Sequence, residues 1–103
     1  MANAGDFSFE AIKAMGNAVP FLVTNRGETI LELWLEPIGQ DYWLLPGEIV
    51  TVTSYGTWSG HPFETLHEPG RLTVWATSCF ATVSDEIGAE VPGGRNRPPG
   101  TSD

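Results

Sequence analysis

The chain has 103 residues, of which 41% are hydrophobic and 17% are charged, and its formal net charge at pH 7 is −8. This length suits one domain, because two separate cores would each approach the size at which burial no longer offsets the loss of chain entropy. Thirteen acidic residues against five basic ones exclude a basic surface that could neutralise a run of phosphates, so neither nucleic acid nor an anionic membrane is expected as a partner. No apolar run approaches the roughly 20 residues of a membrane span.

Export is not indicated by the first residues of the chain. Residues 1–6 lack the basic region and the following apolar stretch that a signal peptide needs. Cys79 is the single cysteine and cannot form an internal disulfide, which fits a reducing compartment. We therefore expect a cytoplasmic protein.

An N-terminal segment, residues 1–17, is expected to hold one short helix over residues 6–16. Phe9, Ile12 and Met15 recur near helical spacing, Ser8 or Asp6 can cap the start, and a glycine follows at the end. About ten residues cannot hold a helix alone in water, so this one must dock on an edge or an open end of the remaining domain. The side chains that would dock are Phe7, Phe9 and Ile12.

Residues 18–91 carry the pattern of an all-β domain. Runs of four to eight β-branched, aromatic and leucine residues alternate with Gly and Pro about every ten residues. The pattern predicts a small antiparallel β-sandwich or barrel of about seven short strands. The expected strands are 20–24, 29–36, 41–45, 49–55, 63–66, 72–77 and 80–84.

The connections between these strands contain residues whose backbone preferences favour turns. Asn25, Arg26 and Gly27 suit a hairpin in which Asn starts the turn and Gly takes the left-handed conformation. The pairs Pro46-Gly47 and Pro69-Gly70 fit type II turns, in which Gly accepts the positive φ.

Residues 92–103 contain no apolar side chain larger than proline and are rich in Pro and Gly. A segment without core-forming side chains cannot offset the entropy of ordering. We expect a disordered tail.

Alternation along three strands separates a core face from an outer face. In the strand 29–36, leucines occupy alternate positions, so Trp34 between them points outward. The same reasoning places Tyr55 outside in the strand 49–55 and Trp75 outside in the strand 72–77. The inward set is Leu31, Leu33, Leu35, Val50, Val52, Leu72, Val74 and Ala76; the other outward positions are Glu32, Glu36, Ile49, Thr51, Thr53, Thr73 and Thr77.

Two interpretations of the outward aromatic residues remain open. If the strands are neighbours, Trp34, Tyr55 and Trp75 form a platform that stacks sugars or anchors a partner protein, because exposed aromatic clusters mark binding sites. Alternatively, a second sheet, the N-terminal helix or a dimer partner covers these rings. Trp58, in the glycine-bounded loop 56–62, either folds back on the core or projects for recognition.

The residue types that bind metals are few, and their spacing is unfavourable. Metal sites on β-barrels place two histidines one residue apart on a strand, whereas His61 and His67 lie six apart with a proline between them. We expect no metal and no other cofactor, and we interpret both histidines as exposed loop residues. The remaining possible ligands are Glu64, Glu68 and Cys79.

Gly39, followed by Pro46-Gly47-Glu48 before a Val-rich strand, resembles the second conserved motif of cupins. Val23-Thr24-Asn25 with the same later turn is similar to the opening half of cupredoxin domains. Cupins carry a histidine shortly after that turn, where this chain has residues 49–54 without one. Cupredoxins place Cys, His and Met ligands near their end, where Cys79 is followed by neither His nor Met. The resemblance transfers no site residue, and it implies as an alternative a divergent metal-binding domain that uses its two histidines.

No catalytic site is predicted, and an enzyme is not favoured. Cys79 has no activating motif around it and is expected as a lone buried thiol. Glu32 and Glu36 stand about 13 Å apart along one strand, which exceeds the spacing of a glycosidase pair. The sequence favours a small binding or protein-interaction module that acts through the outer aromatic residues or Trp58. Its partner would be a protein, a small ligand or a glycan, and a carbohydrate-binding module built on Trp34 and Trp75 is a further alternative; oligomeric state and strand order are not readable.

Overall fold

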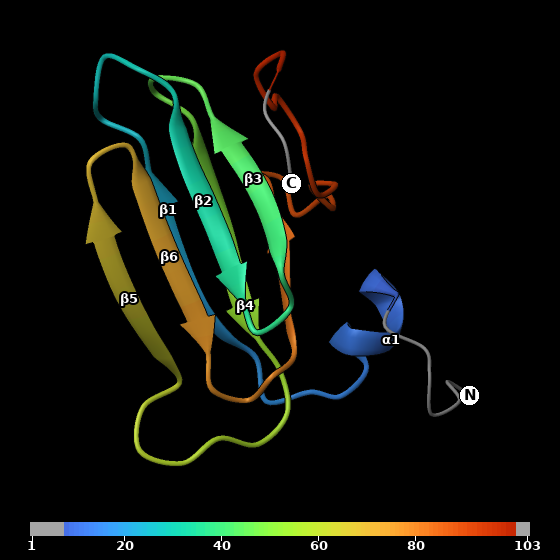
Figure 1. Cartoon of the computed structure of the whole chain (residues 1–103). Coiled ribbons are helices and arrows are strands. Elements are labelled where there is room, and N and C mark those ends of the chain that lie inside the picture. The colour runs from blue at the N-terminus through green and yellow to red at the C-terminus, as the bar shows by residue number, and fades with distance from the viewer. Residues whose placement is uncertain (1–7, 101–103) are drawn as a thin grey trace.

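The computed structural model describes residues 8–100 as seven strands in two sheets with one short helix (Figure 1). The predicted all-β class is confirmed. The helix is α1 (Phe9–Lys13), and the strands are β1 (Val19–Thr24), β2 (Leu31–Glu36), β3 (Gln40–Leu44), β4 (Ile49–Ser54), β5 (Phe63–Glu68), β6 (Arg71–Ala76) and β7 (Ala81–Ser84). Within these residues no helix is long and apolar enough to cross a membrane.

The two sheets divide the strands in an order that differs from chain order. One sheet has three strands in the order β1-β4-β7, and the other has four in the order β3-β2-β6-β5. Figure 1 shows the four-stranded sheet in front of the three-stranded one. All neighbours are antiparallel except β2 and β6, which run parallel.

The core lies between the sheets and follows the predicted alternation. Leu33 and Leu35 on β2 and Val74 on β6 are fully buried, and they share one cluster with Val50 and Val52 on β4 of the other sheet. Because successive side chains of a strand point to opposite faces, this burial fixes which residues face outward. The neighbours of these residues along β2 and β6 therefore form the outer face of the four-stranded sheet.

The segment expected as a hairpin at residues 25–27 is instead a crossover between sheets. β1 pairs with β4, and β2 belongs to the other sheet, so no hairpin joins β1 to β2. Asn25 is buried because it links the loop to the sandwich: its side-chain amide donates to the carbonyls of Leu44 and Thr29, both at 2.9 Å, and its Oδ1 accepts from the Gly27 amide. The bond from the Gly27 amide to Asn25 Oδ1 is an Asx turn, so the Asn-Arg-Gly pattern marks a local turn without specifying that the flanking strands pair.

The two Pro-Gly turns have the expected conformation at their glycines. Gly47 has a φ of 88° and Gly70 a φ of 77°, values that favour glycine. The turn at Gly47 is closed by the Glu48 amide, which donates to the Leu45 carbonyl at 3.0 Å.

The helix is shorter than expected but docks at a strand edge. Ser8 caps it, accepting from the Ala11 amide at 3.2 Å, and Ile12 is the buried residue of α1. α1 lies beside β7, the last strand of the three-stranded sheet. Asp6 and Phe7, which the sequence placed in this helix, lie outside the described residues.

The expected disordered tail is not confirmed, because residues 92–100 have a defined path beside β3 (Figure 1). The Gly94 amide donates to the Asp41 carbonyl at 2.6 Å, and the Trp43 amide donates to the Arg95 carbonyl at 3.2 Å. The segment thus hydrogen-bonds to the outer edge of β3 through its backbone. Its order does not depend on apolar side chains, whose absence had predicted disorder. Residues 101–103 lie outside the described residues.

Candidate functional site

The outer face of the four-stranded sheet carries three of the four tryptophans, and we call Trp34, Trp43, Trp75 and Leu66 the tryptophan face. Cross-strand partners project to the same side of a sheet. Trp34 on β2 lies opposite Thr73 on β6, and Trp75 lies opposite Glu36. Trp43 on β3 and Leu66 on β5 extend the face to the outer strands. The structure therefore brings Trp34 and Trp75 together on neighbouring strands.

Trp34 is held in place by charged neighbours on its own face. Its indole N–H donates to the Glu36 carboxylate. The guanidinium of Arg71 stands 5.3 Å from the ring centre, within the range of a cation–π contact, and is 3.6 Å from the Glu32 carboxylate. The half-buried Trp34 ring is thus partly covered, and it supports the face more than it offers an open stacking surface.

Trp43 is a member of the face for which the sequence analysis assigned no role. Its indole N–H donates to Asp41 Oδ2 at 2.8 Å, and Asp41 in turn accepts from Arg97 Nε at 2.7 Å and from Arg97 Nη2 at 2.6 Å. The hydrogen bonds from Arg97, opposed by burial and assisted by the Trp43 indole, lower the pKa of Asp41 to about 2. The alternation of β3, Gln40-Asp41-Tyr42-Trp43-Leu44, was the signal that could have placed Trp43 outside.

The exposed apolar part of the face lies on β6 and β5. Trp75 is 44% exposed and Leu66 is 67% exposed. They flank the same region of the β5–β6 ladder, since Leu66 lies opposite Thr73 and Trp75 lies opposite Glu64. Such side chains remain in water only at a cost in solubility, which a binding role explains.

Carboxylates surround these two apolar side chains. Glu64 and Glu68 are exposed on β5, and Glu36 lies opposite Trp75. Within residues 8–100 no ion pair involves any of the three. Because Arg71 lies opposite Glu68, the net negative charge is concentrated at Glu36 and Glu64, on either side of Trp75.

Tyr55 and Trp58 do not belong to this face. Tyr55 follows β4 in the other sheet, where its amide donates to the Phe80 carbonyl at 2.9 Å, so the predicted three-residue platform is not formed. Trp58 lies in the loop between β4 and β5 and is 37% exposed. No ring pair joins Trp58 to Trp34 or Trp75 among the described residues.

The edges of the two sheets are protected to different degrees. The C-terminal segment lies along β3, and Val91 donates its amide to Val83 of β7 at 2.9 Å. β1 carries Pro20, which has no N–H to offer a further strand. β5 is six residues long, contains no proline, and has five exposed residues. It is the edge most open to another chain among those that the structure describes.

The residue types of metal and nucleophilic chemistry are scattered. Among residues 8–100 no three His, Cys, Asp or Glu side chains gather in a way that could hold a metal ion. His61 and His67 are both exposed, but His67 lies on β5 and not in a loop. Cys79 is exposed with a φ of 71°, so the expectation of a buried thiol is wrong, because the tight connection between β6 and β7 turns it outward.

The tryptophan face and the β5 edge together form the candidate site, and their chemistry is that of recognition: apolar anchors, backbone hydrogen-bonding groups and negative charge. Comparison with protein-family models, with curated proteins and with solved structures finds no match to this chain.

Proposed function

We propose that the protein is a binding module that captures a basic, extended segment of a partner protein along β5. The segment would add a strand to the four-stranded sheet and place apolar side chains on Leu66 and Trp75. The observation that carries the proposal is the unprotected β5 edge beside these two exposed side chains. Strand addition supplies backbone hydrogen bonds, and pockets for alternate side chains supply specificity.

Charge supports the choice of a basic partner. Glu64 and Glu68 project from β5 to the tryptophan face, within a chain whose formal charge is −8. Two copies of this edge would repel each other, so the same glutamates that disfavour self-association favour lysine and arginine on a partner. Complementary charge of this kind speeds association and adds selectivity.

A protein partner fits the tryptophan face better than a sugar does. Sugar stacking needs open aromatic rings, whereas Arg71 lies over the ring of Trp34 and the indole N–H groups of Trp34 and Trp43 are bound to carboxylates. Of the three rings on the face, those of Trp34 and Trp43 are half-buried and only that of Trp75 is exposed. One open ring with an exposed leucine beside it is a small apolar anchor for a side chain.

An array of random octapeptides tests the proposal. We expect the bound sequences to be enriched in Lys and Arg that alternate with apolar residues, because alternation places one set of side chains on the tryptophan face. Synthetic copies of the best peptides should shift the amide resonances of residues 63–68 and the indole N–H of Trp75. Their affinity should fall with added salt.

Substitutions test whether Leu66 and Trp75 contribute to peptide affinity. The double variant Leu66→Ala, Trp75→Ala should stay folded and lose at least about tenfold in affinity. Ile87→Ala is the matched control, since Ile87 is 89% exposed but lies outside the tryptophan face. The proposal is contradicted if the bound octapeptides are not enriched in basic residues, or if the double variant binds them as tightly as wild type does. Selective binding to glycans on an array, without binding to peptides, would assign the face to carbohydrate.

A further inference from the structure

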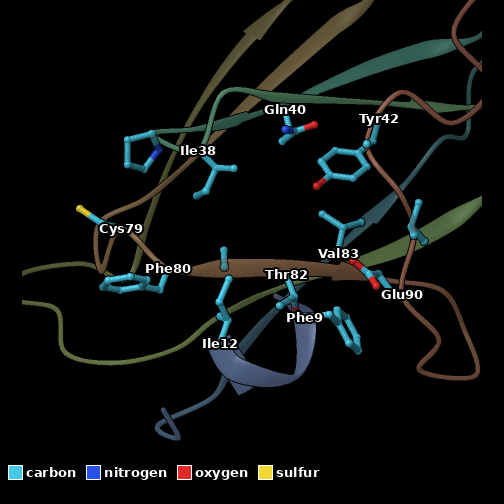
Figure 2. Close-up of a pocket in the computed structure, with 14 residues that line it drawn as sticks. Phe9, Ile12, Ile38, Gln40, Tyr42, Cys79, Phe80, Thr82, Val83 and Glu90 are labelled. Atoms are coloured by element: carbon cyan, nitrogen blue, oxygen red, sulfur yellow. The ribbon is translucent and has the colours of Figure 1, made fainter. Parts of the chain in front are cut away.

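A second concave site lies on the side of the sandwich opposite β5. A cavity of about 570 Å³ opens between β3 of one sheet and β7 of the other, with α1 against it. Figure 2 shows Ile38, Tyr42 and Val83 on one side of the β7 ribbon and Phe9, Ile12 and Thr82 on the other. Its volume is within the range of roughly 300–1,000 Å³ that small-molecule pockets occupy.

Tyr42 brings a hydroxyl into a cavity of mixed lining, which is apolar at Ile12 and Ile38 and polar at Gln40 and Glu90. Its side chain comes from β3 and is 7% exposed, and its hydroxyl points into the cavity (Figure 2). No hydrogen bond joins that hydroxyl to another group within residues 8–100, and its oxygen is not among the fully buried atoms that lack a partner, so it is accessible from the cavity. A hydroxyl that opens into a cavity and has no partner in the protein is free to donate to a ligand group there.

The hydroxyl stays protonated over the whole physiological range. Burial, together with the negative charges of Glu90 and Asp41, raises the pKa of Tyr42 to about 12. Tyr42 is therefore available as a neutral hydrogen-bond donor.

Backbone groups of β7 add further donors and one acceptor. The Val83 carbonyl accepts from Val91 and so points away from β4. Because N–H and C=O groups alternate sides along an antiparallel ladder, Ala81, two residues earlier, also turns its N–H and C=O away from β4. These two groups and the Val83 N–H make no hydrogen bond within residues 8–100. Three backbone groups thus face the same opening as the Tyr42 hydroxyl.

From this convergence we infer that the cavity between β3 and β7 binds an uncharged small molecule that joins apolar groups to a carbonyl oxygen. The oxygen accepts from the Tyr42 hydroxyl, and the apolar groups lie against Ile38 and extend around the edge of β7 toward Phe9 and Ile12. An anionic ligand is disfavoured, because Glu90 lies at the cavity and the chain is acidic. A peptide strand is excluded by length, since only residues 81–83 of β7 are open, fewer than the five or six residues of an ordinary strand.

Two probes of the same shape test the inference on the full chain. Benzophenone carries a carbonyl oxygen between two rings, and diphenylmethane has the same rings without the oxygen. We expect benzophenone to shift the amide resonances of Ala81 and Val83 in a ¹⁵N-labelled sample, and to bind several-fold more tightly than diphenylmethane. Shifts confined to residues 63–68 or to the Trp75 indole, or no shifts at all, would overturn the inference and leave the proposed function untouched.

The variant Tyr42→Phe isolates the hydroxyl, because it keeps the ring in the core. We expect its affinity for benzophenone to fall about three- to tenfold, in line with the loss of one neutral hydrogen bond, while diphenylmethane binds unchanged. Tyr55→Phe, in the other sheet and outside the cavity, is the matched control. An equal affinity of wild type and Tyr42→Phe for benzophenone would show that the hydroxyl does not hold the ligand.

Discussion

The Asp41 carboxylate joins β3 to the C-terminal segment. It accepts from the Trp43 indole on its own strand and from Nε and Nη2 on one edge of the Arg97 guanidinium, which comes from the C-terminal segment. A bidentate, charge-assisted pair of this kind is stronger than a neutral hydrogen bond and has a fixed geometry. Since the Asp41 side chain is only 10% exposed, its charge depends on these partners.

The depressed pKa of Asp41 predicts a pH dependence of stability. The pKa falls from 3.8 to about 2 on folding, so the folded state favours the ionised carboxylate. Its stabilising contribution is full at pH values well above 4 and is lost as the pH falls toward 2. We expect the difference in free energy of unfolding between wild type and Asp41→Asn to shrink over this range, measured by urea denaturation at pH 7, 4 and 2.5. A difference that stays constant would show that the Arg97 pair does not form in solution.

Neighbouring residues on β2 provide a test of the strand register. Leu33 has 0% exposure, so Leu33→Ala should cost on the order of 2–5 kcal/mol by removing buried methyl groups and leaving a cavity. Glu32→Ala should cost less than about 1 kcal/mol, because Glu32 pairs with Arg71 at the surface, where ion pairs contribute little. Chemical denaturation measures both; a reversal of the two costs would place the opposite face of β2 in the core.

The elements themselves were largely predictable, because their signals are local. Alternation and the Pro-Gly turns place the strand ends within a residue or two of those observed, and Gly47 has the conformation expected for its turn. The path of residues 92–100 was not predictable, because it depends on polar contacts to β3, over 40 residues away in the chain. The hairpin at residues 25–27 was predicted wrongly for a related reason, because the pairing of β1 with β4 and the bond from Asn25 to the Leu44 carbonyl join residues far apart in the chain.

The C-terminal segment is expected to contribute to stability as an element. Truncation after Val91 removes Arg97 and uncovers the edge of β3. The loss of charge-assisted hydrogen bonds is worth about 1–3 kcal/mol, which corresponds to a fall in Tm of roughly 5–15 °C for a domain of this size. Differential scanning calorimetry of this truncation, beside one after Gly100 as control, measures the effect. Equal Tm values for the two would mean that the segment does not pack.

At the scale of the whole molecule, the sequence predicted only part of the arrangement of the candidate site. Trp34 and Trp75 share a face because β2 and β6 are neighbours, which pattern alone could not establish. Tyr55 is separated from them because β4 belongs to the other sheet, and strand order depends on contacts between residues far apart in the chain. The cavity at Tyr42 could not be predicted from the sequence for the same reason, because it forms where β3, β7 and α1 meet.

The sheet order also has a kinetic consequence. Only the pairs β2–β3 and β5–β6 join strands that follow each other in the chain, whereas β1–β4, β4–β7 and β2–β6 each close a long loop. Loop closure must precede these contacts, so we expect refolding in milliseconds to seconds, far slower than for a helical bundle of similar size. Stopped-flow tryptophan fluorescence measures this rate, and refolding within microseconds would show that the long-range pairs do not limit it. During that interval the two hairpins are the structures that can form earliest, and the parallel pairing of β2 with β6 is the step that brings Trp34 and Trp75 onto a common surface.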